Sequence, residues 1–300
     1  MRFNRIVMTI LGVLGISFAA VKTLSTGLDE LSSSSIIGST DDRVSFADPN
    51  AGQLLGLSHS EMESIKRATG YVVCVDKEGG RTYGSAAIVH SARTVVTASH
   101  VLKDFSDLSG CHFQNQMESA VARRFDSSMD ASQIVRNSEL NDYAVLRLVE
   151  DIPDAIPFRL VQGPVREGTE LMMISANQSR PESPFDMQYP VGQVCRVRDV
   201  WPANEERGTI FYSDCDLSHG GSGSLNLIRQ SVGGFLGAFA IAVGAGSDSH
   251  ADGREYDKNE NVYTVSILIS DGLREAILKV SGDTLLSRLY FRLDSAPKVL

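Results

Sequence analysis

The sequence predicts an all-β fold of the sandwich or barrel class that ends in one helix. Short β-rich runs follow one another from Tyr71 onward and are separated by turn residues. No amphipathic stretch of crossover-helix length alternates with them, which argues against a parallel α/β sheet. Glycine is frequent, at 26 of 300 residues, and aromatic residues make up only 7%, a balance that favours many turns over a helical bundle.

The expected strands follow in order along the chain. Their ranges are 71–75, 84–89, 94–98, 143–148, 171–175, 192–197, 209–213, 235–243 and 262–267. Beyond the last of them, residues 271–280 keep Leu273, Ile277 and Val280 at helical spacing. This pattern predicts a C-terminal helix that packs on the β domain.

The segment before the first strand is expected to contain a linker or pro-segment and one short helix. Residues 20–69 begin with a stretch rich in Ser, Asp and Gly that shows no sustained periodicity. Ser58 followed by Glu61 forms a capping box that should open a helix through about Arg67. We therefore expect the folded domain to span 70–282 and leave the tail 283–300 unassigned.

Residues 1–19 have the features of an export signal. Arg2 and Arg5 precede an uncharged run from Ile6 to Val21, and small residues occupy the two positions of 17–19 that a signal peptidase reads. We expect cleavage after Ala19 and a periplasmic or secreted protein. The run is shorter than the roughly 20 apolar residues that span a bilayer. Membrane association is therefore expected only if this segment stays uncleaved as an anchor.

The charge of the chain points away from polyanionic partners. The formal net charge is -9 and the sequence pI is about 5.2, with no dense Lys/Arg cluster to offset them. Neither nucleic acid nor an anionic membrane surface is expected as a main partner.

The four cysteines form an even set in a chain that is expected to be exported, which favours disulfides. Four cysteines allow three pairings. We favour the local pairing, Cys74 with Cys111 and Cys195 with Cys215. A zinc site is the alternative, but the chain lacks CxxC and HxxxH spacing, so no metal is expected.

Three blocks of sequence carry the residue types that acyl transfer by a serine requires, namely a hydroxyl nucleophile, a base and a carboxylate that orients the base. Thr97-Ala98-Ser99-His100 follows an apolar strand, and Asn141-Asp142-Tyr143 places an acid immediately before a buried strand. The third block, 216–224, is a glycine-dense turn around Ser222.

These blocks resemble the TAAHC, D-[IV]-A-L and GDSGG signatures of the trypsin-like, or chymotrypsin-fold, serine proteases. The similarity runs from about Tyr71 to Gly272, and the bacterial glutamyl endopeptidases and HtrA protease domains are the most similar members. The resemblance implies two antiparallel six-stranded β-barrels with the active site in the cleft between them. It also implies a serine endopeptidase that acts on protein or peptide substrates without a cofactor, through His100, Asp142 and Ser222.

The glycines of the third block have a mechanical role in this interpretation. Backbone N–H groups that point at a developing oxyanion stabilise it. The resemblance places such an oxyanion hole at Gly220, Gly221 and Ser222, where glycine permits a tight, positive-φ path. Gly221 occupies the place of the acid that pairs with a freed amino terminus in digestive enzymes. We therefore expect activity without that processing.

The residues of the substrate pocket are assigned by position. Asp216 lies six residues before Ser222, where trypsin carries the acid that selects Arg or Lys, and a structural acid is the alternative. His219 is either a pocket residue or a solvated turn residue. The other wall is expected from the small apolar run that includes Phe239 and Ala240, which suits an uncharged substrate side chain.

Two other interpretations compete with the protease. A nucleophile elbow of the α/β-hydrolase type fails because Ser224 replaces the last glycine of G-x-S-x-G, and because that fold orders its triad Ser, acid, His. An inactive trypsin-fold binding or scaffold protein remains the alternative. An active enzyme needs a neutral His100, so its activity should rise through roughly pH 6 to 8.

Overall fold

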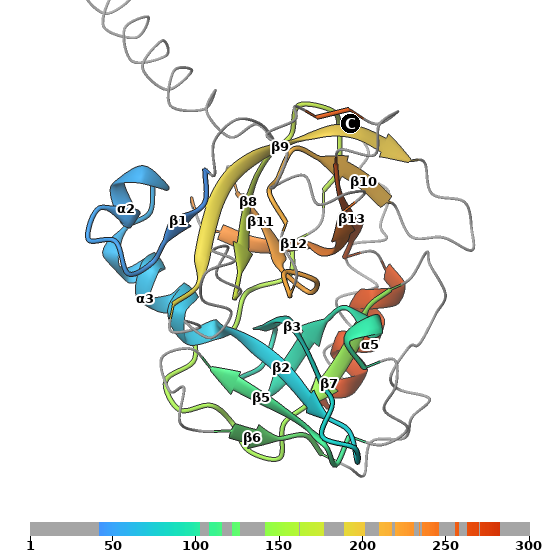
Figure 1. Ribbon diagram of the computed structural model, residues 1–300. Coiled ribbons are helices and arrows are strands. Elements are labelled where there is room, and N and C mark those ends of the chain that lie inside the picture. The colour runs from blue at the N-terminus through green and yellow to red at the C-terminus, as the bar shows by residue number, and fades with distance from the viewer. Residues whose placement is uncertain are drawn as a thin grey trace, which may run out of the picture.

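Two antiparallel β-sheets, one after the other along the chain, make up most of the computed structural model (Figure 1). The structure describes residues 42–282 apart from 103–107, 116–121, 127–141, 162, 177–188, 202–209, 218–219, 231–233, 235, 246–255, 258–262 and 270. The expected signal, residues 1–19, the tail 283–300 and His219 therefore lie outside the described residues.

The first sheet has six strands in the order β6-β5-β2-β3-β4-β7. An antiparallel bridge between Phe125 and Leu148, just beyond the two edge strands, brings the edges of the curled sheet together. The strands are β2 (Thr69–Val75), β3 (Arg81–Ile88), β4 (Thr94–Thr97), β5 (Cys111–Asn115), β6 (Ala122–Arg124) and β7 (Ala144–Arg147).

The second sheet has seven strands in the order β1-β9-β10-β13-β12-β11-β8. Strand β8 also pairs with β9, which closes all of the strands except β1 into a barrel. The expected fold of two β-barrels is thus confirmed, with the first as a curled half-barrel and the second closed. The strands are β1 (Val44–Ser45), β8 (Glu170–Ser175), β9 (Val191–Trp201), β10 (Ile210–Ser213), β11 (Leu225–Arg229), β12 (Leu236–Ala245) and β13 (Thr264–Leu268).

The N-terminal segment contains helices α2 (Ala51–Leu54) and α3 (His59–Ala68). The expected capping box is present, because the Ser58 hydroxyl accepts a hydrogen bond from the Glu61 amide and the Glu61 carboxylate accepts one from the Ser58 amide. Residues 42–57, which fall in the expected linker, are packed instead. Strand β1 pairs with β9, and Phe46 and Leu55 are buried.

The C-terminal helix α5 (Asp271–Ser281) leaves the second barrel and packs against β4 and β7 of the first (Figure 1). Leu273, Ile277 and Val280, the three residues that predicted it, are buried. Burial of this apolar stripe is what holds a short helix in place.

Both predicted disulfides form, Cys74–Cys111 and Cys195–Cys215. Cys74 and Cys111 face each other on β2 and β5, and the second bridge ties β9 to the segment after β10. Two buried disulfides indicate an oxidising compartment, extracellular or periplasmic. None of the described helices is long and apolar enough to cross a membrane.

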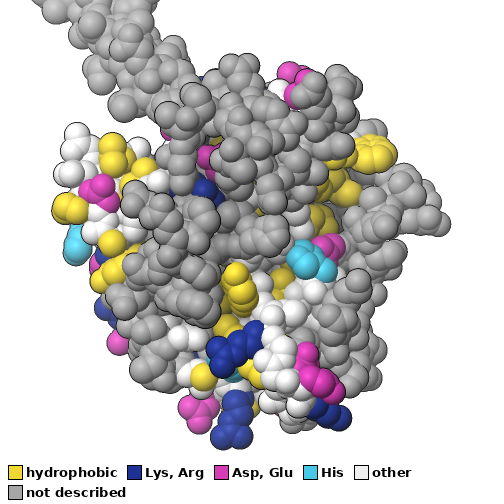
Figure 2. Space-filling model, in the orientation of Figure 1, with side chains coloured by type: hydrophobic (Ala, Val, Ile, Leu, Met, Phe, Trp, Pro, Cys, Tyr) yellow, Lys and Arg dark blue, Asp and Glu magenta, His cyan; other side chains and the backbone are white. Residues whose placement is uncertain are grey.

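Hydrophobic side chains gather on the surface over the end of β9 and over β10 and β13 (Figure 2). Trp201 is half exposed there and stacks on Tyr212, whose ring in turn meets the edge of Tyr263. Elsewhere on the face drawn in Figure 2, acidic and basic side chains are interspersed.

Candidate active site

His100 lies on a short 3-10 helix, η1 (Ser99–Leu102), that directly follows β4. The Thr82 hydroxyl of β3 donates a hydrogen bond to the Val101 carbonyl at 3.0 Å and so ties η1 to the first sheet. The His100 side chain is 43% exposed, which leaves its imidazole accessible from solvent.

The register of β4 and β7 brings Asp142 to His100. Thr97, the last residue of β4, is paired with Ala144, the first residue of β7. In an antiparallel pair, the residues after the end of one strand lie beside those before the start of the other. The acid that precedes β7 and the histidine that follows β4 therefore meet at the same edge of the sheet.

Asp142 accepts three hydrogen bonds at this edge. One carboxylate oxygen, Oδ1, accepts from the Ser99 hydroxyl at 2.6 Å and from the His100 amide at 2.8 Å. The other, Oδ2, lies 2.5 Å from Nδ1 of the His100 ring. The carboxylate thus fixes the orientation of the imidazole and holds the proton of the ring at Nδ1, which leaves Nε2 as the acceptor.

The electrostatics of Asp142 follow from these contacts. Burial raises the pKa of Asp142, but the hydrogen bonds from His100 and Ser99 together outweigh burial, so its pKa lies below the ordinary aspartate value. Asp142 is therefore charged at neutral pH.

Ser222 lies in a tight turn before β11. Gly220 and Gly223, on either side of it, have φ of 79° and 92°, in the region that favours glycine. The Ser224 amide and hydroxyl both donate to the Gly221 carbonyl, at 2.9 and 2.5 Å, and the Gly223 amide donates to the Ala242 carbonyl of β12 at 2.7 Å. The turn is thus anchored to β12 of the second barrel through Ala242.

The turn also docks on the first barrel. The Ser85 amide and hydroxyl of β3 donate to the Gly220 carbonyl at 2.9 and 3.0 Å. A Cβ atom on Gly223 would collide with the Ser85 carbonyl oxygen and lie 2.6 Å from the Thr97 hydroxyl oxygen. Thr97 is the last residue of the strand beyond which His100 and Asp142 meet, so the Ser222 turn approaches that end of β4 from the second barrel.

The described contacts do not join the Ser222 hydroxyl to the pair of His100 and Asp142. Among the described residues, the Ser222 hydroxyl makes no hydrogen bond to His100. Catalytic hydrogen bonds are often long in unliganded enzymes and shorten when substrate binds.

Two backbone amides of the turn have no described acceptor. Gly220 and Ser222 donate to no described group, whereas the amides of Gly223 and Ser224 are both used. Backbone amides that donate to no described group, one two residues before the serine and one of the serine itself, are the kind of donor that a developing oxyanion requires.

A family model described as a trypsin-like peptidase domain matches residues 84–231, a range that contains all three site residues. Residues 84–231 thus carry a trypsin-like peptidase domain, and the match supports the trypsin-like serine protease family for this domain. No curated protein sequence matches it.

Solved structures of trypsin-like proteases share the fold. The thermostable serine protease AL20 from an extremophilic microorganism has a TM-score of 0.50 and 14% sequence identity, over 74% of this chain and 99% of that chain. The active form of the Rv3671c protease from M. tuberculosis has a TM-score of 0.51 and 12% identity, over 81% of this chain and 89% of that one. At these identities the likeness concerns the fold.

The expected pocket residues of this trypsin-like domain lie in two different surroundings. Asp216 is buried, at 5% exposure, on the segment that leads to Ser222. Phe239 and Ala240 have no exposed surface and belong to the core of the second barrel, where Phe239 packs against Phe211. Their burial does not support the assignment of these two residues to a wall that a substrate touches.

Sequence reasoning missed the role of Ser99 as a hydrogen-bond donor to Asp142. The signal was available, since a serine stands where the family signature has its second alanine. The described residues contain no group of three or more His, Cys, Asp or Glu side chains placed to hold a metal ion.

Proposed function

We propose that this protein is a serine endopeptidase with His100, Asp142 and Ser222 as its catalytic triad. The observation that carries the proposal is the convergence at the end of β4. Asp142 is hydrogen-bonded to the backbone and ring of His100, and Gly223 docks the Ser222 turn against Thr97, three residues before His100.

The chemistry follows from the orientation of each group. Ser222 Oγ attacks the carbonyl carbon of the peptide bond while its proton passes to Nε2 of His100. The charged Asp142 stabilises the imidazolium that forms. His100 then gives this proton to the leaving amine, the C–N bond breaks, and an acyl-enzyme remains on Ser222. Water then attacks the acyl carbon while its proton passes to His100, and His100 gives this proton to Ser222 Oγ as the ester C–O bond breaks and the acid product leaves.

The amides of Gly220 and Ser222 hold the oxyanion of the tetrahedral intermediate, with Gly221 as the link that sets their direction. The loss of one such donor typically costs about 100- to 1000-fold in rate. Ser85 of the other barrel fixes the Gly220 carbonyl and so holds the Gly220–Gly221 peptide, which links the two amides, in place before substrate binds.

The enzyme acts outside the cytoplasm on protein or peptide substrates and needs no cofactor. The two disulfides support the oxidising compartment. Gly221 provides no acid for a freed amino terminus, and residues 42–57 are packed on β9. Activity therefore does not depend on cleavage within that segment.

Labelling with a fluorophosphonate tests the proposal. The folded wild-type protein should form one adduct, on Ser222 by peptide mapping, and Ser222→Ala should form none. Ser60→Ala, which removes an exposed hydroxyl on helix α3, is the matched control and should still label at Ser222. A folded wild-type protein that does not label would favour a binding or scaffold protein with the same fold.

A further inference from the structure

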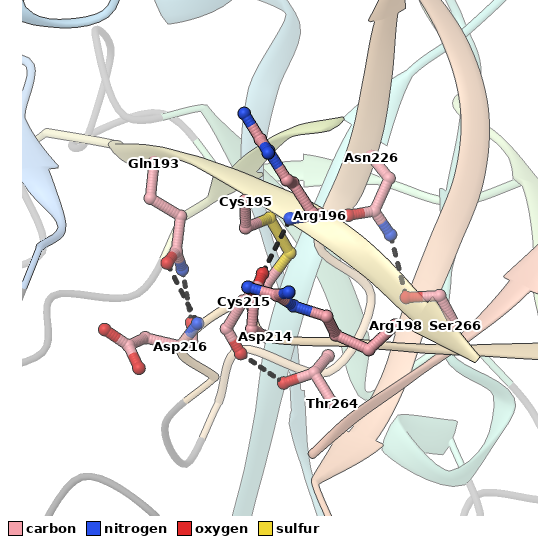
Figure 3. The surroundings of a disulfide bond; sticks show 10 residues. All are labelled: Gln193, Cys195, Arg196, Arg198, Asp214, Cys215, Asp216, Asn226, Thr264 and Ser266. Carbon is pink, nitrogen blue, oxygen red and sulfur yellow. Dashed lines mark hydrogen bonds and ion pairs between the residues drawn. A yellow bond between two sulfur atoms is a disulfide. The ribbon is translucent and has the colours of Figure 1, made fainter. Parts of the chain in front are cut away.

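The three residues Asp214, Cys215 and Asp216, which lead from β10 toward the Ser222 turn, are held one by one from the second barrel (Figure 3). The Asp214 carboxylate accepts from the Arg196 amide and the Arg198 side chain, and the Asp214 amide donates to the Arg196 carbonyl. Cys215 is bonded to Cys195, and its carbonyl accepts from the Thr264 hydroxyl at 2.6 Å.

Gln193 of β9 completes this series with two hydrogen bonds to the backbone of Asp216. Its Nε2 donates to the Asp216 carbonyl oxygen at 2.6 Å, and its Oε1 accepts from the Asp216 amide at 2.9 Å. The carboxamide thus pairs with the backbone of Asp216 as a neighbouring strand would. Gln193 is only 2% exposed, so both bonds are shielded from water.

The strand that carries Gln193 is itself fixed on both sides. Gln193 is paired with Met173 of β8, and its neighbour Gly192 is paired with Ile174 of β8 and with Val44 of β1. A flexible surface side chain would add little rigidity to the loop, whereas a buried side chain on a doubly paired strand provides a rigid anchor.

We infer that Gln193 is a positioning residue that fixes the backbone of Asp216 and thereby sets the substrate-binding pocket beside Ser222. This inference rests on the proposed protease function and on the expected place of Asp216 at the substrate pocket. The clamp acts on the loop and not on the triad. Its loss should therefore change which substrate side chains are accepted more than it changes the reactivity of Ser222.

We expect substrate preference and Ser222 reactivity to respond differently because the Asp216 segment and the Ser222 turn have different contacts. The Ser222 turn has its own anchors in Ser85, Ala242 and Ser224. Asp216 lies before that turn and depends on Gln193 for its amide and carbonyl bonds. Removal of the carboxamide leaves two buried backbone groups of Asp216 without these partners, which strongly favours a local rearrangement.

Gln193→Met is the test variant, because it keeps the length of the side chain and removes both the donor and the acceptor. Asn115→Leu is the matched control. Asn115 is also a carboxamide at 2% exposure, but it donates to the carbonyls of Arg67 and Thr69 in the first barrel, on another part of the molecule.

Three measurements on the full chain then separate the roles. Gln193→Met should be labelled by a small fluorophosphonate at a rate close to that of the wild type. Its kcat/KM for the preferred peptides should fall by about tenfold or more, mainly through KM, with an altered preference for the residue before the cut. Deuterium exchange of the peptide that covers 213–217 should accelerate by about tenfold or more.

Each other outcome overturns the inference. An unchanged preference profile with unchanged exchange at 213–217 shows that the clamp does not set the pocket. An equal shift in Asn115→Leu shows a general loss of rigidity. A wild-type protein that neither labels nor cleaves peptides refutes the proposed function, and the pocket assignment with it, even if exchange at 213–217 still responds to Gln193→Met.

Discussion

At the scale of single residues, the Asp142 carboxylate connects the local structure to the chemistry. It holds His100 by the ring and by the backbone amide, so the imidazole cannot rotate away without the loss of its bond to Oδ2. Ser99 adds a third bond. This carboxylate also gives the protein a dependence of stability on pH that can be measured apart from activity.

The first prediction concerns the stability that Asp142 contributes. Its pKa is lower in the folded protein than in the unfolded chain, where an aspartate titrates near about 3.9. The contribution of its charge is therefore fully present above that pH and is lost as pH falls through the folded pKa. Urea unfolding from pH 6 down to pH 2 should show a gap between wild type and Asp142→Asn that narrows below about pH 4. A gap that is constant over this range would contradict the assignment of the shift.

The second prediction concerns Gly223, which lets the nucleophile turn approach the first barrel. Gly223→Ala should place a methyl group against the Ser85 carbonyl and Thr97, push Ser222 from its place and reduce fluorophosphonate labelling by about 100-fold.

Gly168→Ala is the control for Gly223→Ala, because Gly168 also has a positive φ, of 81°, but has nothing within 4 Å of an added Cβ. Both variants should lose roughly 1–2 kcal/mol of unfolding free energy from the unfavourable φ. Only Gly223→Ala should lose labelling. Equal labelling in the two variants would show that the close approach at Gly223 is not needed.

At the scale of elements, the segment 42–57 is where the structure differs most from expectation. The sequence there has no periodicity, because its strand has only two residues and its first helix only four. Its order comes from tertiary contacts instead. Leu55 and Phe46 pack against Gly192 of β9, and Arg229 of β11 donates to Glu61 and to the Gly56 carbonyl.

The third prediction tests whether this segment is part of the folded domain. Leu55 is 4% exposed and its neighbour Leu54 is 55% exposed. Leu55→Ala should therefore lower the unfolding free energy by about 2–4 kcal/mol through the cavity that it leaves. Leu54→Ala should change it by less than about 0.5 kcal/mol. Equal effects in chemical denaturation would mean that the segment does not pack on the second barrel in solution.

The strands were predictable from sequence where their residues are apolar and β-branched. β2, β4, β8 and β13 lie within a few residues of their expected ranges, as does helix α5. Strands β5 and β6, Cys111–Asn115 and Ala122–Arg124, carry charged and polar residues and were not expected. Their backbone pairing with β2 and with each other makes them strands, and that pairing leaves no pattern in either segment alone.

At the scale of the whole molecule, the candidate site exists only because two barrels meet. The motifs in the sequence identify His100, Asp142 and Ser222, since each lies in a short, recognisable frame. Gln193 lies in no such frame and contacts Asp216, 23 residues further along the chain. Its role depends on how β9 faces the segment after β10, which sequence spacing does not encode.

The sequence alone does not distinguish a pocket wall from a barrel interior at Phe239 and Ala240. A run of small apolar residues near the expected position is equally suited to a pocket wall and to a barrel interior. The two residues are consecutive on β12, so their side chains point to opposite faces of the strand, and neither has exposed surface.

The most direct test of the central claim is a mutational cycle on His100 and Ser222, with kcat/KM measured on one good peptide substrate. Residues that act as one catalytic unit are strongly non-additive. We predict that His100→Ala and Ser222→Ala each abolish most of the activity and that the double variant is hardly slower than either one. Losses that multiply, or a single variant that keeps wild-type activity, would show that the two side chains do not work together across the barrels.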